Sequence, residues 1–191
     1  MNNDVLVSEN WIENLINTAE RNHLKIISPA MVEGRNLDYD FETFANEASI
    51  KMKDALRIGR RHAVCFAVHE SVWADIGYFR ATPNLLGFED SIFFKQVERA
   101  GIPTAITGGS WLHHFGSITQ SEMKRERGLK EKDDLVGRGH NRAKLLEQSW
   151  LERKIARAQQ KRQVKAWRNA EVNQYGMSLL SSRENSEFIW R

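Results

Sequence analysis

The sequence predicts an α/β fold in which helices flank a mixed sheet, with a charged helical extension at the C-terminus. Residues 11–19 carry apolar side chains at helical spacing, and residues 24–30 form an apolar run that is typical of a strand. A second buried strand is expected over residues 63–68. From residue 121 onward charged side chains dominate, and the remaining apolar positions have helical spacing. The alternation of helices with buried strands favours the α/β class.

The composition is typical of a globular protein that carries a solvated extension. Of the 191 residues, 41% are hydrophobic and 28% are charged. The net charge of +3 is unevenly distributed, because residues 124–168 hold 15 Lys and Arg against 6 Asp and Glu. The rest of the chain is therefore net acidic. We expect one domain over residues 1–120 and a basic helical extension over residues 121–191.

The first elements are expected from short local signals. Residues 5–7 form a short apolar run, after which Ser8 is expected to cap the helix at residues 11–19. The strand at residues 24–30 follows and contains Pro29 near its end, where a missing N–H group is tolerated. This order of helix and strand is the start of an alternating architecture.

In the middle of the chain, some segments have clear secondary-structure signals and others have weak ones. Residues 41–56 are expected to be irregular or weakly helical, whereas residues 69–77 and 90–100 are expected to form helices that end at glycine. A short strand is expected at residues 104–107. The pair Gly108-Gly109 is then expected to turn the chain.

The cysteine content and the hydropathy pattern indicate an intracellular location. The one cysteine, Cys65, lies in an apolar run and is expected to be a buried core residue in a reducing compartment. No run approaches the roughly 18 apolar residues of a membrane helix, and the start of the chain does not have the pattern of a secretory signal. We expect the protein in the cytosol, free or at a membrane surface.

The acidic turn Asn2-Asn3-Asp4 is the first candidate site. Mg²⁺ and Mn²⁺ prefer oxygen ligands and often bridge a carboxylate to a diphosphate. A carboxylate in a turn beside a strand is able to supply such a ligand. Taken alone, the same tripeptide is more often an ordinary turn.

The second candidate is Gly87-Phe88-Glu89-Asp90, which opens the helix at residues 90–100. A carboxylate there is able to take the proton of an attacking hydroxyl. The N-terminus of a helix stabilises the ionised form and so weakens the base, while the neighbouring Glu89 acts in the opposite direction. The alternative is that both carboxylates only cap the first turn.

The third candidate is His113-His114, followed by the turn Gly116-Ser117. A neutral imidazole is able to complete a metal site, and the turn allows backbone N–H groups to approach a phosphate. The alternative is a pair of surface or core histidines. The order and spacing of the three candidates argue for a shared site.

Taken together and in this order, the three motifs resemble those of the family 2 glycosyltransferases of the GT-A fold, a Rossmann-like α/β architecture. The resemblance covers about residues 2–120, and it implies a partial GT-A domain there. It further implies that Asp90 is the catalytic base and that Glu89 orients the base or the acceptor. Asp4 would be the metal ligand, and His114 would contact the metal or the diphosphate. The residues that would contact the metal and the nucleotide-sugar are Asn2, Asn3, Asp4, His114 and Gly116.

The resemblance implies inverting transfer of a sugar from a nucleotide-sugar to a hydroxyl of a glycan or a lipid-linked acceptor. The cofactor would be Mg²⁺ or Mn²⁺. In the family a nucleotide-binding segment precedes the acidic turn, so a separate N-terminal half is an expected partner.

Two other interpretations remain. The chain is alternatively a non-catalytic remnant or an interaction module. Its basic extension is then expected to be a solvated tail, or to bind an anionic membrane surface. Binding of nucleic acid through Trp150 and Trp167, which lie among Arg and Lys, is the less favoured alternative.

Overall fold

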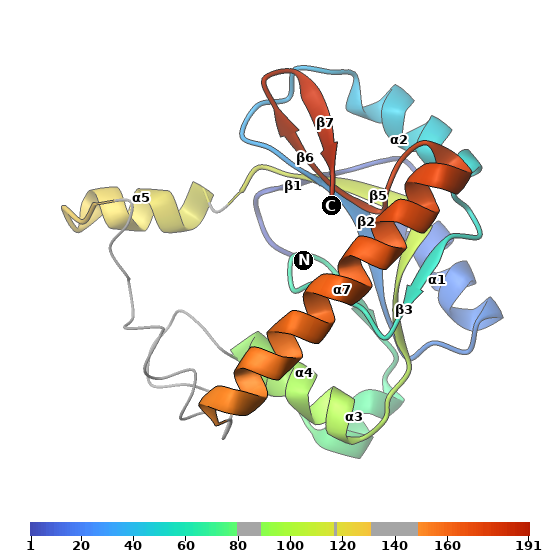
Figure 1. Cartoon of the computed structure of the whole chain (residues 1–191), viewed down its shortest axis with the longest axis vertical. Helices are drawn as coiled ribbons and strands as arrows, with labels where there is room; N and C mark the ends of the chain where they lie inside the picture. Colours follow the sequence, from blue (N-terminus) through green and yellow to red (C-terminus); the bar gives the residue numbers. More distant parts are fainter. Residues whose placement is uncertain (80–88, 117, 131–148) are drawn as a thin grey trace. The chain divides into compact units, whose positions relative to one another are not determined.

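The chain is shown as a computed structural model in Figure 1. It forms two compact units. The described residues are 1–79, 89–116, 118–130 and 149–191, without the side chains of residues 119, 120, 150 and 153. Unit 1 comprises Met1–His69, Pro103–Gly116 and Arg162–Arg191. Unit 2 comprises Glu70–Ile102 and Ser117–Lys161. Residues 162–191 therefore belong to the same unit as the first 69 residues.

Unit 1 is built on a seven-stranded mixed sheet with the order β1-β5-β2-β6-β7, in which β3 pairs with β5 and β4 pairs with β2. The strands are β1 (Val5–Val7), β2 (Ile26–Glu33), β3 (Leu56–Ile58), β4 (Ala67–Val68), β5 (Thr104–His114), β6 (Leu180–Glu184) and β7 (Glu187–Trp190). The central strands β5, β2 and β6 are parallel, and the other pairs are antiparallel. The predicted α/β class, with helices flanking a mixed sheet, is confirmed.

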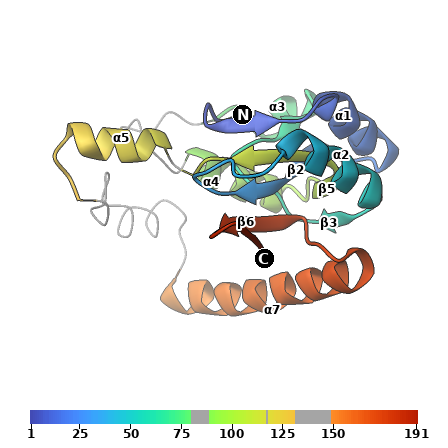
Figure 2. The ribbon, with the colours of Figure 1, turned by 90° about the horizontal axis from the view of Figure 1, so that it is seen from above.

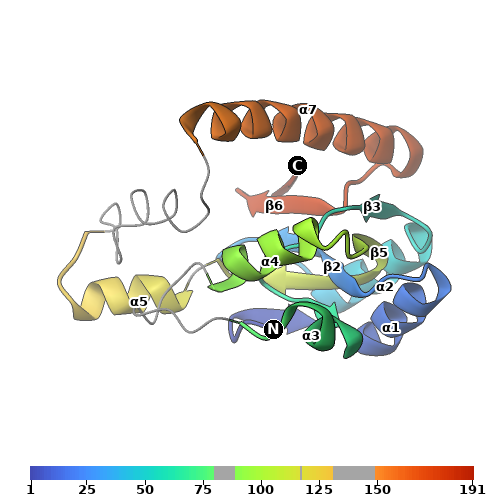
Figure 3. The same cartoon turned by 90° about the horizontal axis from the view of Figure 1, so that it is seen from below.

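The two helices of the first half pack on different faces of the sheet. Helix α1 (Trp11–Arg21) places Leu15 in a cluster with Ala105, and α2 (Phe41–Lys51) packs in a cluster with Ile106. Ala105 and Ile106 are neighbours on one strand and so point to opposite faces. Figures 2 and 3 show α1 and the end of α7 (Trp150–Tyr175) that belongs to unit 1 on opposite sides of the sheet.

The C-terminal segment completes the sheet. Strand β6 lies parallel to β2, with Val32 opposite Ser181, and β7 returns antiparallel to β6. Met177 and Leu179 are buried in the same cluster as α2. These two strands lie within the segment that is expected to be a helical extension, and β6 gives no strand signal because it contains two serines and two charged residues.

Unit 2 contains α3 (Ser71–Ile76), α4 (Glu89–Arg99), α5 (Ile118–Glu126) and the first part of α7. An aromatic cluster joins α3 to α4, since the ring of Trp73 lies 5.4 Å from that of Phe93. The helices predicted at residues 69–77 and 90–100 are confirmed to within two residues.

Several local predictions are wrong. Ser8 does not cap α1, because the helix begins after Asn10, which is in the left-handed conformation and makes no side-chain cap bond. Of the strand expected at residues 63–68, only Ala67–Val68 is a strand. By contrast, the helical alternative for residues 41–56 is confirmed over α2, whose first turn is capped by the Asp40 side chain.

The predicted turn at Gly108-Gly109 is also wrong, because β5 runs through both glycines. Glycine is needed at residue 108 for close packing. A Cβ atom there would lie 2.5 Å from the main-chain oxygen of Met52 and 2.8 Å from Leu179 Cδ2. The glycine marks a strand that another backbone approaches closely.

We expect Gly108→Ala to lower the free energy of unfolding by about 3 kcal/mol, because the new methyl group overlaps a backbone oxygen that cannot move aside easily. Gly109→Ala is the matched control, since the nearest atom to its Cβ in a residue not adjacent in the chain would be Thr18 Oγ1, at 3.4 Å. We expect that control to change the same quantity by less than about 1 kcal/mol. Urea unfolding of the two variants measures the difference, and equal effects would contradict the packing role of Gly108.

Candidate functional site

The candidate site lies at the edge of the sheet where the parallel strands end. In the register of the sheet, Glu33 at the end of β2 pairs with His114 at the end of β5 and with Ser182 of β6. Strand β1 runs in the opposite direction and begins there, with Val5 opposite His114. The carboxyl ends of parallel strands are where open α/β sheets bind their ligands.

Asp4 and His114 come together at this edge. The Oδ1 atom of Asp4 lies 3.5 Å from Nε2 of His114, and both side chains are 8% exposed. On the other side of the ring, Oε1 of Glu33 lies 3.9 Å from Nδ1 of His114. Asp4 and His114, which are expected from the sequence to share one site, are in contact in the structure.

Three polar side-chain atoms of this pair lack hydrogen bonds. Among the described residues, Asp4 Oδ1 and both ring nitrogens of His114 are buried without a hydrogen-bond partner. Buried polar atoms are normally satisfied by protein, water or a ligand, so an orphaned cluster calls for an occupant. An ion or a polar ligand group between Asp4 and His114 would supply it.

The adjacent histidines have different environments because neighbours on a strand face opposite sides of the sheet. The ring of His113 is fully buried, with Nε2 2.8 Å from the Gly34 carbonyl oxygen and Nδ1 2.9 Å from the Tyr39 hydroxyl. Its Nε2–H must donate to Gly34, so Nδ1 accepts from Tyr39. Burial lowers the pKa of His113 and favours this neutral form. Both ring nitrogens of His113 therefore have hydrogen-bond partners, whereas those of His114 do not.

Backbone contacts hold the acidic turn against the end of β5. The N–H group of Asn2 donates to the Val64 carbonyl, and the N–H group of Phe115 donates to the Asp4 carbonyl. Gly116 follows with φ of 72°, a conformation that favours glycine. Asn2, Asn3 and Gly116 thus flank the Asp4–His114 contact in the chain, and Ser117 lies outside the described residues.

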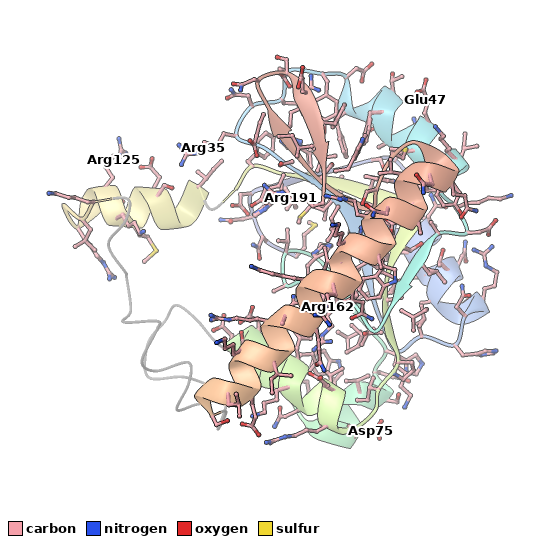
Figure 4. The ribbon with its side chains drawn as sticks, viewed as in Figure 1. Arg35, Glu47, Asp75, Arg125, Arg162 and Arg191 are labelled. Carbon is pink, nitrogen blue, oxygen red and sulfur yellow. The ribbon has the colours of Figure 1, made fainter. Side chains whose placement is uncertain are left out.

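Glu33 is a member of this cluster that is not predicted from the sequence. It is the last residue of β2 and directly precedes Gly34. Its Oε2 accepts from Nη1 of Arg191 at 2.9 Å, and Nη2 of Arg191 lies 3.5 Å from Glu184. Figure 4 labels Arg191 beside the sheet. A carboxylate directly after a buried apolar run was the signal that would have found Glu33.

A third histidine lies close to the site. His62 Nε2 is 2.8 Å from the Pro29 carbonyl oxygen, and its Nδ1 is 3.4 Å from the Cys65 N–H nitrogen. Burial lowers the pKa of His62 to about 4, and the nearby His114 acts in the same direction. His62 is thus a neutral structural residue at neutral pH. Cys65 is buried and free, as expected.

The predicted catalytic carboxylates belong to unit 2. Glu89 and Asp90 occupy the first turn of α4, and both are partly buried. The Ser91 N–H group donates to Asp90 Oδ1 at 2.7 Å. Gly87 and Phe88 of the same motif lie outside the described residues. The structure thus places Asp90 at a helix start, where a carboxylate is held by backbone N–H groups.

Asp4 and His114 fit a cation that takes its remaining ligands from water or from a bound molecule. Among the described residues, no three His, Cys, Asp or Glu side chains gather as ligands of one ion. Two ligands each about 2.1 Å from an ion lie about 3.0 to 3.4 Å apart, close to the Asp4–His114 separation. Mg²⁺ sites often use only one or two carboxylates and complete the shell with substrate phosphates and water. The pair therefore suits an ion that is shared with a phosphate ligand.

Comparison with known proteins does not assign the chain to a family. No protein-family model matches the sequence, and no similar curated protein was found. Within the part of the chain that the structure describes, no helix is long and apolar enough to cross a membrane.

Proposed function

We propose that the chain is an inverting glycosyltransferase, or the acceptor-side and catalytic part of one. The donor would be a nucleotide-sugar and the acceptor a hydroxyl of a glycan or a lipid-linked sugar. The Asp4–His114 contact is the observation that carries this proposal. Two residues from distant motifs meet at 3.5 Å, with buried side-chain atoms that make no hydrogen bond, where the parallel strands β2 and β5 end.

The chemistry of the side chains at the Asp4–His114 contact indicates a role for each residue there. Asp4 and His114 would hold Mg²⁺ or Mn²⁺, with Glu33 on the far side of the imidazole ring orienting it. When bound, the cation would neutralise the charge that develops on the leaving diphosphate. Asn2, Asn3 and Gly116 would line the same edge and contribute backbone N–H groups to the phosphates.

Asp90 would act as the general base and take the proton of the acceptor hydroxyl, and Glu89 would orient the acceptor. Glu89 adjoins Asp90 in the first turn of α4, and both side chains are partly buried. A carboxylate that is positioned within hydrogen-bond reach of the attacking hydroxyl acts as a general base.

We expect Asp90→Asn to abolish sugar transfer and to leave Mn²⁺ binding unchanged. General-base catalysis contributes about 10²- to 10⁴-fold in rate, and an amide cannot accept the proton. The measurement is release of nucleoside diphosphate from a panel of nucleotide-sugars with Mn²⁺. It uses the chain alone and together with any separate nucleotide-binding polypeptide that co-purifies with it.

Asp75→Asn is the matched control, because Asp75 is an exposed carboxylate of α3 in the same unit. It should retain full transfer. Transfer by Asp90→Asn at the wild-type rate would make the base assignment wrong. If the wild-type chain neither binds Mn²⁺ nor releases nucleoside diphosphate, the non-catalytic module is the better interpretation.

A further inference from the structure

Helix α7 carries a stripe of cations that the transferase proposal does not use. At 100° per residue, five Lys and Arg side chains fall within an arc of about 80° on one face of the helix. The stripe consists of Lys154, Arg157, Lys161, Lys165 and Arg168. At 1.5 Å per residue it is about 21 Å long. All of its members except Arg168 are exposed, and Arg168 is partly exposed.

The charges of Arg157, Lys161 and Lys165 are not neutralised within the helix. Glu152 projects from the opposite face, and Glu171 is buried in an ion pair with Arg57. Among the described residues, no carboxylate pairs with Arg157, Lys161 or Lys165. A row of like charges along a straight helix repels itself unless an anionic surface faces it. The stripe therefore suits a partner that presents negative charge over a similar length.

Exposed apolar side chains lie beside the stripe. Leu151 is 58% exposed and Ile155 is 49% exposed, and both project from the face of α7 next to the cations. An amphipathic helix with basic and apolar side chains next to each other lies in the interface of an anionic bilayer. Burial of Leu151 and Ile155 between lipid headgroups would add to the electrostatic attraction.

The same observations disfavour a nucleic acid as the partner. Sequence-tolerant binding of single strands needs exposed aromatic rings on which bases stack. The Trp167 ring is instead occupied, with the guanidinium groups of Arg57 and Arg60 each 5.9 Å from its centroid. The side chain of Trp150 lies outside the described residues. Nucleic acid would also leave Leu151 and Ile155 in water.

We propose that α7 docks on the anionic surface of a lipid bilayer through the cationic stripe, with Leu151 and Ile155 entering the headgroup layer. The inference is independent of the transferase proposal, because it rests on charge and exposure of α7 alone. It assigns an interaction surface to the basic extension.

The test is co-sedimentation of the full chain with two kinds of vesicle, phosphatidylcholine alone and phosphatidylcholine with one-third phosphatidylserine. We expect binding to the anionic vesicles only, weakened strongly at ~0.15 M ionic strength relative to low salt. Near an anionic surface each cation contributes ~1 kcal/mol, so the variant Arg157→Gln/Lys161→Gln/Lys165→Gln should bind about a hundredfold more weakly. Gln retains the helix propensity of these positions.

The control variant Arg21→Gln/Lys51→Gln/Lys53→Gln removes the same charge from exposed positions elsewhere and should bind normally. Leu151→Gln/Ile155→Gln should weaken vesicle binding and leave the weak binding of a single-stranded oligonucleotide unchanged. Equal binding to both kinds of vesicle, or equal losses in the two triple variants, would overturn the proposal. Tighter binding to the oligonucleotide than to anionic vesicles would do the same and would assign the stripe to nucleic acid. Should the first triple variant fail to fold, the comparison of the two vesicles with the wild-type chain decides.

Discussion

Replacing Glu171 by glutamine is expected to lower the free energy of unfolding by about 3–5 kcal/mol, because it leaves the buried Arg57 guanidinium without its counter-charge. Arg57 is 0% exposed and Glu171 is 7% exposed. The free energy of unfolding of a typical domain is about 5–15 kcal/mol, so this loss is a large fraction of the total. Thermal or urea unfolding, followed by circular dichroism, measures it.

The expected loss of stability is large because the buried Arg57–Glu171 ion pair makes several hydrogen bonds. Arg57 donates from Nε and Nη2 to the two carboxylate oxygens of Glu171, at 2.7 and 2.8 Å. Nη2 also lies 2.7 Å from the Ser178 hydroxyl oxygen, and the Leu179 N–H group donates to Glu171. Nη1 of Arg57 is buried without a partner. After the loss of Glu171 the guanidinium therefore keeps only the contacts of Nη2 with the Ser178 hydroxyl and, at 2.9 Å, with the Arg191 main-chain oxygen. The pair joins β3 to α7 and to the start of β6.

A double variant separates the charge effect from lost packing. Arg57→Met/Glu171→Met removes both charges and should cost much less than the sum of the two single changes, because no isolated ion remains. The exposed pair Arg21 and Asp54 is the control, with side chains 60% and 67% exposed. Arg21→Gln should change the free energy of unfolding by less than about 1 kcal/mol. A loss below about 1 kcal/mol for Glu171→Gln would contradict the structural role of the pair.

The second large effect concerns metal binding. We expect Asp4→Asn and His114→Gln each to weaken Mn²⁺ binding by more than about tenfold, since each removes one of the two proposed ligands. Loss of a residue that only hydrogen-bonds to a metal ligand already weakens metal binding by about 10- to 100-fold. Mn²⁺ alone is the probe, followed by electron paramagnetic resonance of the free ion. The readout does not depend on a donor, an acceptor or any activity.

Matched controls exist for both changes. Asp54→Asn and His69→Gln replace an exposed aspartate and an exposed histidine. His69 lies at the other end of β2, where its N–H group donates to the Lys25 carbonyl. Neither control should alter Mn²⁺ affinity. Unchanged affinity in both site variants, with folding intact, would make the assignment of Asp4 and His114 wrong and leave the membrane proposal untouched.

Much of the candidate site was predictable from residue types. Asp4 and His114 were assigned to one site from the order of the motifs, and the structure places their side chains in contact. The choice between His113 and His114 has a simple physical basis, because a strand sends neighbours to opposite faces. Glu33 was missed because its proximity to His114 depends on the pairing of β2 with β5.

The fold was predictable where signals are local and not where they depend on distant contacts. The apolar stripe of α1 and the glycine after α3 identify their helices. The glycines of β5 misled the prediction, since a pair of glycines usually turns a chain. Here Gly108 accommodates the backbone of Met52, a neighbour in space that no local pattern reveals.

By itself, the sequence determined the α/β class, most helices and the residue types able to bind a cation or take a proton, because these depend on neighbours a few positions apart. Only the tertiary structure decided that β6 and β7 extend the sheet, and that Arg57 pairs with Glu171 across 114 residues of chain. It also decided which polar atoms at Asp4 and His114 are buried and unsatisfied. Such features depend on strand register and on burial. Both are fixed only when the whole unit packs, because the free energy of packing must exceed the conformational entropy that the chain loses on folding.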